Sequence, residues 1–330
     1  MDKPLISIIV PVYNVAPYVE DCIRSVMRQT YDGKMECIIV DDCGTDDSMA
    51  IVERIIEDYN GPIIFKLLHH THNRGLSAAR NTGVDAAKGD YLYFLDSDDE
   101  MSDDCLSRMI IQVNKYPGIE LVQGLVQSVP DNAYYHIERY RQVGFIEDNS
   151  WIRKEFFKWR NGFPCQAWNK LVLRDFIRNN KLYFYDGIIH EDNHWMFLVA
   201  QELHRYSVIN AITYTHNLTP NSIVRSLSIN PQNSVESVSK ILSDLIPRIE
   251  QPYSFEQIVY LLSLFINKFV RLGGKSRLWE YEKKFYFLLF HEQKFKGCLL
   301  LFLTLHFSWI KRGRFKKRLI WYLEDGSNKL

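Results

Sequence analysis

The segment GDYLYFLDSDDEM, Gly89–Met101, joins an apolar strand to a cluster of carboxylates. Four acidic residues follow the run YLYFL, with a single serine between the first two. Carboxylates at the mouth of a buried strand repel one another, and desolvation strengthens that repulsion. Two explanations are open at this point. The segment is either a solvated turn at a helix N-terminus, or a site for a hard divalent cation such as Mg²⁺ or Mn²⁺, which prefers carboxylate oxygens.

The region before this segment alternates between apolar strands and helices. Strands are predicted at LISIIVPVYN, MECIIVDDCG, PIIFKLLHH and DYLYFLD. We expect them to be apolar on both faces, the pattern of a parallel sheet with crossover helices in an α/β fold. Tyr13-Asn14, Asp41-Asp42 and the acidic cluster follow three of these strands. Because ligands bind beyond the carboxyl ends of strands in such folds, we expect these side chains to share one crevice.

The composition is typical of a soluble globular protein of about two domains. The 330 residues are 46% hydrophobic and 24% charged, with a net charge of zero. Residues 1–110 hold 20 acidic and 10 basic side chains, a net of −10, whereas residues 261–330 hold 5 acidic and 15 basic ones, a net of +10. This asymmetry suggests that the basic end faces an anionic partner.

The cysteines and the N-terminus indicate a cytoplasmic protein. Six cysteines are scattered without a C-x-x-C pair, which argues against a zinc site and a disulfide framework. The N-terminus lacks the basic start and long apolar core of a signal peptide, and no segment has the ~20 apolar residues that span a bilayer. The glycine motifs G-x-G-x-x-G and G-x-x-x-x-G-K are also absent. A phosphate held in the crevice would therefore need a metal ion to neutralise it.

Four stretches together resemble the family 2 glycosyltransferases of the GT-A fold. They are SIIVPVYN, CIIVDDCGTDDS, NRGLSAARNTG…AKGDYLYFLDSDD and GIIHEDNHW. The resemblance implies an inverting, metal-dependent enzyme that uses nucleotide-diphosphate sugars, with a mostly parallel central sheet and flanking helices. It places a catalytic domain at residues 1–225, with a nucleotide-sugar half at 1–110 and an acceptor half at 111–225. A helical, basic region would occupy residues 226–330.

The resemblance assigns the donor site to residues at the strand ends. In DSD, Asp98 would coordinate Mn²⁺ or Mg²⁺ on the diphosphate, and Asp96 would reach the ribose or sugar side of the donor. Asp99 could add a supporting contact. Asp42 would accept a hydrogen bond from the nucleobase, for instance uracil N3–H, and Asp41 is the less favoured partner. The remaining donor-site residues implied are Pro11, Tyr13, Arg80 and Asn81, with a surface helical arginine as the alternative for Arg80.

The stretch HEDNHW matches the Glu-Asp pair of the family. An inverting transfer needs a base that takes the proton of the acceptor hydroxyl. The resemblance implies Asp192 for that base, with Glu191 as the alternative. A carboxylate pair that only caps the following helix is the competing interpretation, and both can hold together. Trp168 in WNKL corresponds to a position near the acceptor, although a large aromatic is as often part of the core.

The region after these motifs departs from the family pattern. Many relatives carry arginines just before a Ser-Ile pair, where this chain has Asn217 and Thr219. The positive charge that stabilises the diphosphate would then come from another residue, for example Arg225. His216 is a candidate metal ligand, against a purely structural role. We interpret the histidine tract that includes His70 as strand-end and loop residues rather than as a metal site.

The segment 291–318 combines an apolar run with eight basic residues and one acidic residue. It is too short to span a bilayer, so it would lie on an anionic membrane surface or pack on the catalytic domain. Nucleic-acid binding is disfavoured, because the aromatic residues cluster with aliphatic ones and do not interleave with the bases. We therefore predict peripheral attachment to the inner face of the cytoplasmic membrane.

The sequence predicts transfer of a sugar from a nucleotide-diphosphate donor, with UDP as the favoured nucleotide, to a glycan or lipid-linked saccharide in cell-surface polysaccharide biosynthesis. A nucleotidyltransferase is one alternative, disfavoured because no Gly-rich, basic loop follows the first strand. A non-catalytic carbohydrate- or membrane-binding protein on a decayed transferase fold is the other.

Overall fold

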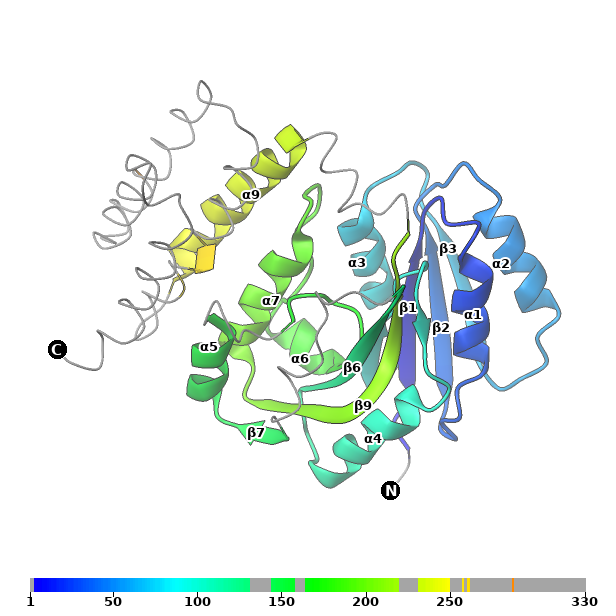
Figure 1. The fold of residues 1–330 in the computed structure, drawn as a ribbon, viewed down its shortest axis with the longest axis horizontal. Helices are drawn as coiled ribbons and strands as arrows, with labels where there is room; N and C mark the ends of the chain where they lie inside the picture. The colour runs from blue at the N-terminus through cyan, green and yellow to red at the C-terminus, as the bar shows by residue number, and fades with distance from the viewer. Residues whose placement is uncertain are drawn as a thin grey trace. The chain divides into compact units, whose positions relative to one another are not determined.

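The structure is a computed structural model of the 330-residue chain, and Figure 1 shows its course. It describes residues 3–130, 144–157, 164–219 and 231–249, together with residues 257, 260, 261 and 287.

The chain divides into two compact units, Met1–Ser237 and Val238–Leu330. The predicted domain boundary after residue 225 lies outside the described residues and stays a prediction. The basic segment 291–318 and Arg225 also lie outside them. The helices described near the boundary are α9 (Pro231–Leu245) and the 3₁₀-helix η3 (Ile246–Arg248).

The first half of unit 1 is a parallel α/β layer, as the sequence predicts. Its strands have the order β3-β2-β1-β4, and every neighbouring pair is parallel. The strands are β1 (Ile6–Val12), β2 (Met35–Asp41), β3 (Ile64–His69) and β4 (Tyr91–Phe94). The helices that connect them are α1 (Val19–Met27), α2 (Ser48–Glu57) and α3 (Leu76–Ala86).

One expectation for these strands is wrong. β1 is buried along its whole length, but every residue of β3 is exposed or half-buried, and Ile64 is 69% exposed. The reason is its position, because β3 forms the edge of the described sheet. An apolar run therefore does not distinguish a central strand from an edge strand.

The second half of unit 1 extends the sheet with strands of mixed direction. β8 is antiparallel to β4 and to β6, and β6 is parallel to β9. The strands are β5 (Glu100–Met101), β6 (Leu121–Val129), β7 (Phe145–Glu147), β8 (Lys170–Leu173) and β9 (Arg205–Asn217). The helices are α4 (Cys105–Lys115), α5 (Asn149–Phe157), α6 (Arg174–Asn179) and α7 (Glu191–Glu202).

Helices cover both faces of the parallel layer (Figure 1). On one face, alternate β1 residues pack with buried residues of α1, α2 and α4 in a continuous core. On the other face, Phe94 meets Phe184 and Trp195 edge-on at 5.4 and 5.8 Å between ring centroids. This second core fixes α7 against the carboxyl end of β4, which is where the site lies.

The helix α3 approaches the sheet unusually closely. A Cβ at Gly83 would lie 2.4 Å from Cγ2 of Ile9 on β1, so only glycine fits there without movement. At the C-terminal end of α3, the guanidinium of Arg178 donates to the carbonyl oxygens of Val84, Asp85 and Ala87. These carbonyls lack partners within the helix, and a cation beside them is stabilising. Both contacts fix the helix that carries Arg80.

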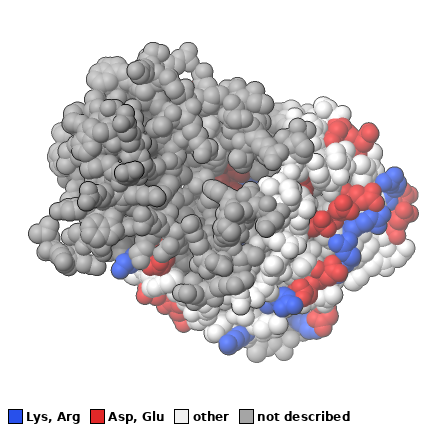
Figure 2. Space-filling model, in the orientation of Figure 1, with Lys and Arg blue, Asp and Glu red and all other residues white. Residues whose placement is uncertain are grey.

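The face in Figure 2 shows acidic and basic side chains interleaved where α1 and α2 lie. Glu20 pairs with Arg24 at 2.8 Å and with Arg54 at 3.5 Å, and Arg28 pairs with Asp103 at 3.0 Å. These pairs join acidic and basic side chains that both belong to residues 1–110, so the net acidic charge of that region is unchanged. No helix within the described ranges has the length and apolarity to cross a membrane.

Replacement of Gly83 by alanine should destabilise the fold. An alanine in a helix interior usually stabilises by about 1 kcal/mol relative to glycine. Here the clash with Ile9 should outweigh that gain, since overpacking costs about 1–3 kcal/mol. We expect the free energy of unfolding in urea to fall by about 1–2 kcal/mol.

Gly144→Ala is the control, because a Cβ at Gly144 has no atom of the described residues within 4 Å. It should leave the unfolding free energy unchanged within about 0.5 kcal/mol or raise it slightly. A stabilised Gly83→Ala variant would contradict the close packing of α3 on β1.

Candidate active site

The polar strand ends meet at one edge of the sheet. Val12 at the end of β1 pairs with Asp41 at the end of β2, and β4 lies on the other side of β1. Asn14 accepts a hydrogen bond from the backbone N–H of Thr45 at 2.7 Å, which ties the turn after β1 to the turn after β2. Tyr13 is 46% exposed at this edge, whereas Pro11 is buried within β1. The predicted crevice residues of all three strands are therefore neighbours.

Asp42 is buried and forms hydrogen bonds with the turn that precedes α3. Its carboxylate accepts from the backbone N–H groups of Arg74 and Gly75, both at 2.8 Å, and lies 2.7 Å from Nδ1 of His70. The opposite ring nitrogen of His70 lies 2.9 Å from the hydroxyl of Thr82. Both oxygens of Asp42 thus already have donors, and its predicted role toward a nucleobase stays a prediction.

Asp41 is the more accessible of the two neighbouring aspartates. Its carboxylate accepts from the backbone N–H of Gly44 at 3.1 Å and lies 3.1 Å from Nδ1 of His69. Its side chain keeps 15% of its surface exposed, against 4% for Asp42. Asn81 lies on α3 beside this region, but its carboxamide is bonded to the backbone of Phe184 in both directions. Its donor-site role also stays a prediction.

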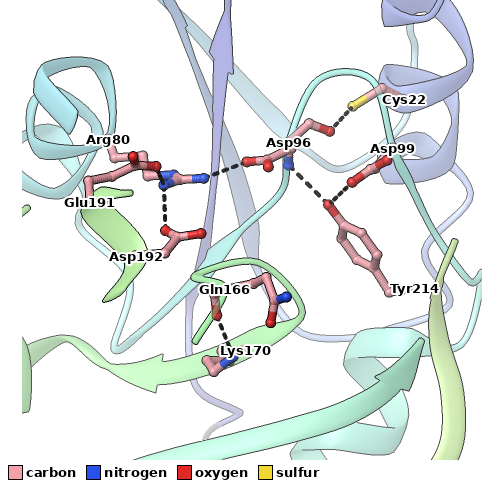
Figure 3. Close-up of polar contacts among 9 residues, drawn as sticks. All are labelled: Cys22, Arg80, Asp96, Asp99, Gln166, Lys170, Glu191, Asp192 and Tyr214. Carbon is pink, nitrogen blue, oxygen red and sulfur yellow. Dashed lines mark hydrogen bonds and ion pairs between the residues drawn. The ribbon is translucent and has the colours of Figure 1, made fainter. Parts of the chain in front are cut away.

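The centre of the site is the guanidinium of Arg80, which is buried and not at the surface (Figure 3). Its Nη2 donates to Asp96 at 2.8 Å. Its Nη1 donates to Glu191 and to Asp192, both at 2.9 Å. The side chain of Arg80 is 1% exposed, and the charges of the three carboxylates raise its pKa further above its usual range. One permanent cation therefore joins the turn after β4 to the first turn of α7.

The acid pair lies at the N-terminus of α7, after a residue in left-handed conformation. His190 has φ of 68°, which turns the chain so that Glu191 and Asp192 both reach Arg80. Burial raises the pKa of Glu191 and of Asp192, and Arg80 opposes that shift in both. A carboxylate whose pKa lies above its ordinary value is a stronger base and is better suited to accept a proton.

The DSDD turn is held from the opposite side by β9. Asp99 is almost fully buried and accepts from the hydroxyl of Tyr214 and the backbone N–H of Asn217, both at 2.8 Å. Burial, then the charges of Asp98 and Asp96, raise its pKa well above the usual range. Asp98 accepts from the hydroxyl of Thr219 at 3.3 Å. Asp99 is therefore held by two donors of β9, whereas the side-chain donor to Asp98 among the described residues is Thr219.

The chemistry of the turn fits a divalent cation. Burial and the neighbouring charge of Asp96 raise the pKa of Asp98 to about 6, so the two carboxylates are incompletely compensated. Within the described part of the chain, no three His, Cys, Asp or Glu side chains are arranged to hold a metal ion. A cation at Asp98 would therefore take most of its ligands from a bound molecule and from water, as Mg²⁺ often does.

His216 and Trp168 lie together on the inner side of β9. Trp168 stacks on Tyr214, with centroids 4.6 Å apart, and on His216, with centroids 5.7 Å apart. Trp168 is 7% exposed and belongs to the main hydrophobic core. This position favours the core interpretation of the two that the sequence leaves open. Burial lowers the pKa of His216, which keeps the ring neutral, but its metal-binding role stays a prediction.

Sequence reasoning missed two buried residues of this region. His70 belongs to the Asp42 network and is more than a strand-end residue. Lys170, in the WNKL stretch, is buried, and its ammonium donates to the carbonyl oxygen of Gln166. Neither burial has a local signal in the sequence, because each depends on the packing of separate elements.

Comparisons with known proteins agree with this geometry. Residues 7–184 match the family model described as glycosyl transferase family 2. An uncharacterized glycosyltransferase of Haemophilus influenzae is 32% identical over 66% of this chain and 78% of its own length. The uncharacterized glycosyltransferase EpsJ of Bacillus subtilis is 32% identical over 67% of this chain, and the match spans 63% of that relative's length.

Solved structures show the same fold. The S. aureus TarS 1–349 structure in complex with UDP-GlcNAc has a TM-score of 0.66 at 18% identity, over 88% of this chain and 80% of that one. The mannosyltransferase PcManGT of Pyrobaculum calidifontis, in complex with GDP-Man and Mn2+, has a TM-score of 0.57 at 15% identity, over 91% and 85%. The predicted GT-A fold is thus confirmed. The chain belongs to glycosyl transferase family 2.

Proposed function

We propose that this protein is an inverting glycosyltransferase that transfers a sugar from a nucleotide-diphosphate sugar, with a UDP-sugar as the favoured donor, to an acceptor hydroxyl. The acceptor would be a glycan or a lipid-linked saccharide in cell-surface polysaccharide biosynthesis. The observation that carries the proposal is the Arg80 network, which brings Asp96 next to Glu191 and Asp192. Structural neighbours in complex with UDP-GlcNAc and with GDP-Man support the donor class.

Asp192 is the proposed base. Its carboxylate would take the proton of the acceptor hydroxyl while that oxygen bonds to the anomeric carbon and the bond from this carbon to the diphosphate breaks. A single displacement of this kind inverts the configuration. Arg80 holds the carboxylate through Nη1 and stabilises its ionised form, and Glu191 shares the same nitrogen. Arg80 therefore holds the proposed base in place and favours its ionised form.

Asp98, with Asp96 beside it, would hold a divalent cation against the diphosphate. A neighbour in complex with Mn2+ supports this assignment. When bound, the cation would act as a Lewis acid for the departing nucleotide diphosphate. The cation would also relieve the repulsion that raises the pKa of Asp98.

Calorimetric titration of UDP into the protein tests the donor site. With Mn²⁺ present we expect a dissociation constant on the order of micromolar, and EDTA should abolish binding because the diphosphate then faces Asp96 and Asp98 unneutralised. Asp98→Ala should abolish metal-dependent binding as well. Asp103→Ala, an exposed aspartate five residues further along the chain, should bind UDP as the wild type does.

Binding of another nucleotide diphosphate instead of UDP would keep the reaction and change the donor. Pyrophosphate release from a nucleoside triphosphate would favour a nucleotidyltransferase. No binding of any nucleotide would favour a non-catalytic protein and would contradict the proposal.

Asp192→Asn should abolish transfer and leave donor binding intact. Loss of a positioned base costs about 10²- to 10⁴-fold in kcat. Because burial raises the pKa of Asp192, activity of the wild type should decline on acidification at a pH above the ordinary aspartate value of about 3.9. Steady-state kinetics from pH 5 to 9 measure both effects.

Glu202→Gln, an exposed change at the other end of the same helix, provides the control and should retain wild-type kcat. Wild-type activity of Asp192→Asn would show that Asp192 is not the base, and Glu191→Gln would then test the alternative.

Arg80→Met should destabilise the protein strongly, because it leaves Asp96, Glu191 and Asp192 without their cation. Removal of one partner from a buried ion pair costs about 3–5 kcal/mol. The folded-state pKa of Glu191 and Asp192 would lie even further above the unfolded values, so the folded variant binds more protons than its unfolded chain. The loss of unfolding free energy of the variant relative to the wild type should therefore shrink as the pH falls from 7.5 to 5.

Urea unfolding of the variant and the wild type at the two pH values measures this loss of unfolding free energy. Arg54→Met removes an arginine of which 67% is exposed and which pairs with Glu20 at 3.5 Å. This control should cost less than about 1 kcal/mol at either pH. An equally small loss for Arg80→Met would contradict the role given to the network.

A further inference from the structure

His190 is an unusual residue for the position that it occupies. It is the N-cap of α7, with φ of 68° and ψ of 30° in the left-handed region. Glycine and asparagine adopt this conformation at the lowest cost, and Ser, Thr, Asp or Asn is the preferred cap of a helix. The side chain of His190 makes no capping hydrogen bond to the described first turn of α7. Neither the turn nor the cap therefore explains why the residue is a histidine.

The side chain of His190 has a partner on α9. Its Nε2 lies 2.8 Å from the hydroxyl of Ser234, and the backbone N–H of the preceding Ile189 donates to the hydroxyl of Ser237 at 2.9 Å. Both serines belong to unit 1, as the proposed base does, and they are 4% and 5% exposed. Residues three apart lie on the same face of a helix. One face of α9 thus binds both residues that precede the acid pair.

These serines differ from another serine of the same helix. Ser243 donates to the carbonyl oxygen of Ser239 at 2.8 Å, the bond to the preceding turn that helical serines commonly form. Ser234 and Ser237 contact a separate segment of the chain. A hydroxyl can donate or accept, so the contact between Ser234 and His190 persists whichever ring nitrogen carries the proton.

The segment before α7 is held at its other end by α3. The carboxamide of Asn81 donates to the carbonyl oxygen of Phe184 at 2.8 Å and accepts from its N–H at 2.9 Å. It also lies 3.1 Å from the carboxylate of Asp186 as a donor. Residues 184–190 are therefore fixed at the start by the helix that carries Arg80 and at the end by α9.

We propose that His190, Ser234 and Ser237 are positioning residues for the transfer reaction, which orient Asp192 toward the acceptor hydroxyl. We call these three residues the His190 anchor. This inference rests on the proposed function. A base must lie within hydrogen-bond reach of the proton that it accepts, and a small displacement lowers the rate strongly. Arg80 holds the carboxylate of Asp192, whereas the anchor holds the backbone that precedes it and does not touch the reacting atoms.

The first test removes the hydroxyl of Ser234. Alanine has a higher helix propensity than serine, so Ser234→Ala should keep α9 intact. The assay is nucleotide release from UDP-N-acetylglucosamine and GDP-mannose, with water or octyl glycosides as acceptor. We expect kcat to fall about three- to tenfold, while the donor KM stays within about twofold. Ser243→Ala, the same substitution on the same helix, is the matched control and should retain the wild-type kcat.

The second test separates the anchor from the turn. Glycine adopts the left-handed conformation without steric cost, so a residue that only turned the chain could be replaced by glycine without loss. Because His190→Gly has no ring to contact Ser234, we expect kcat to fall at least about tenfold. Both substitutions remove the same contact, so their double variant should be no slower than the slower single variant. Additive losses, or a folded His190→Gly variant with wild-type kcat, would overturn the assignment.

Amide hydrogen exchange supplies a readout that does not depend on turnover. The N–H of Ile189 is hydrogen-bonded to Ser237, so Ser237→Ala should raise the exchange rate of a peptide covering residues 186–194 about fivefold. Peptides from β1 should exchange as in the wild type, which shows that the variant is folded. Unchanged exchange of residues 186–194 in the Ser234→Ala/Ser237→Ala double variant would contradict the anchor.

The measurements distinguish this inference from the proposed function. If the wild-type protein releases nucleotide and the anchor variants match it, the role of the anchor is wrong and the transferase proposal stands. If the wild-type protein releases no nucleotide from either donor and binds none, the proposed function fails, and the role of the anchor in transfer fails with it.

Discussion

The buried ion network around Arg80 is the constraint on which the site depends. Three carboxylates from two distant segments share one guanidinium that has almost no contact with solvent. Such a network is stable only while every member is paired, because each unpaired charge would be left in a low-dielectric interior. A planar guanidinium can donate in several directions at once, which an ammonium cannot do with the same geometry. The helix that carries it must therefore be placed accurately, and the contacts of Gly83 and Arg178 do this.

Much of this arrangement follows from the sequence. The apolar runs and turn residues locate the four parallel strands, and parallel strands must bring their carboxyl ends to one edge. That geometry alone places Tyr13, Asp41 and the DSDD turn near one another. The Glu-Asp pair at the start of α7 was also predictable, since acidic residues before an apolar helical run indicate a helix N-terminus.

The partners of the charged groups were not predictable from local pattern. Arg80 in SAARNTG looks the same whether it is exposed on a helix or buried against α7, and only the packing of α7 decides. His70 meets Asp42 across elements whose distance depends on sheet twist and helix position. The edge position of β3 is a property of the whole sheet, which the composition of one strand does not encode.

The DSDD turn has a consequence for how such a chain can be divided. Its acidic residues belong to the first half of unit 1, yet Tyr214, Asn217 and Thr219 of the second half hold them. The two halves of unit 1 therefore cannot be exchanged independently of each other. A chimaera that joins the first half of this chain to the second half of a relative would inherit the acidic turn without the residues that hold it. Recombination within this family should succeed only where the segment equivalent to β9 travels with the acidic turn.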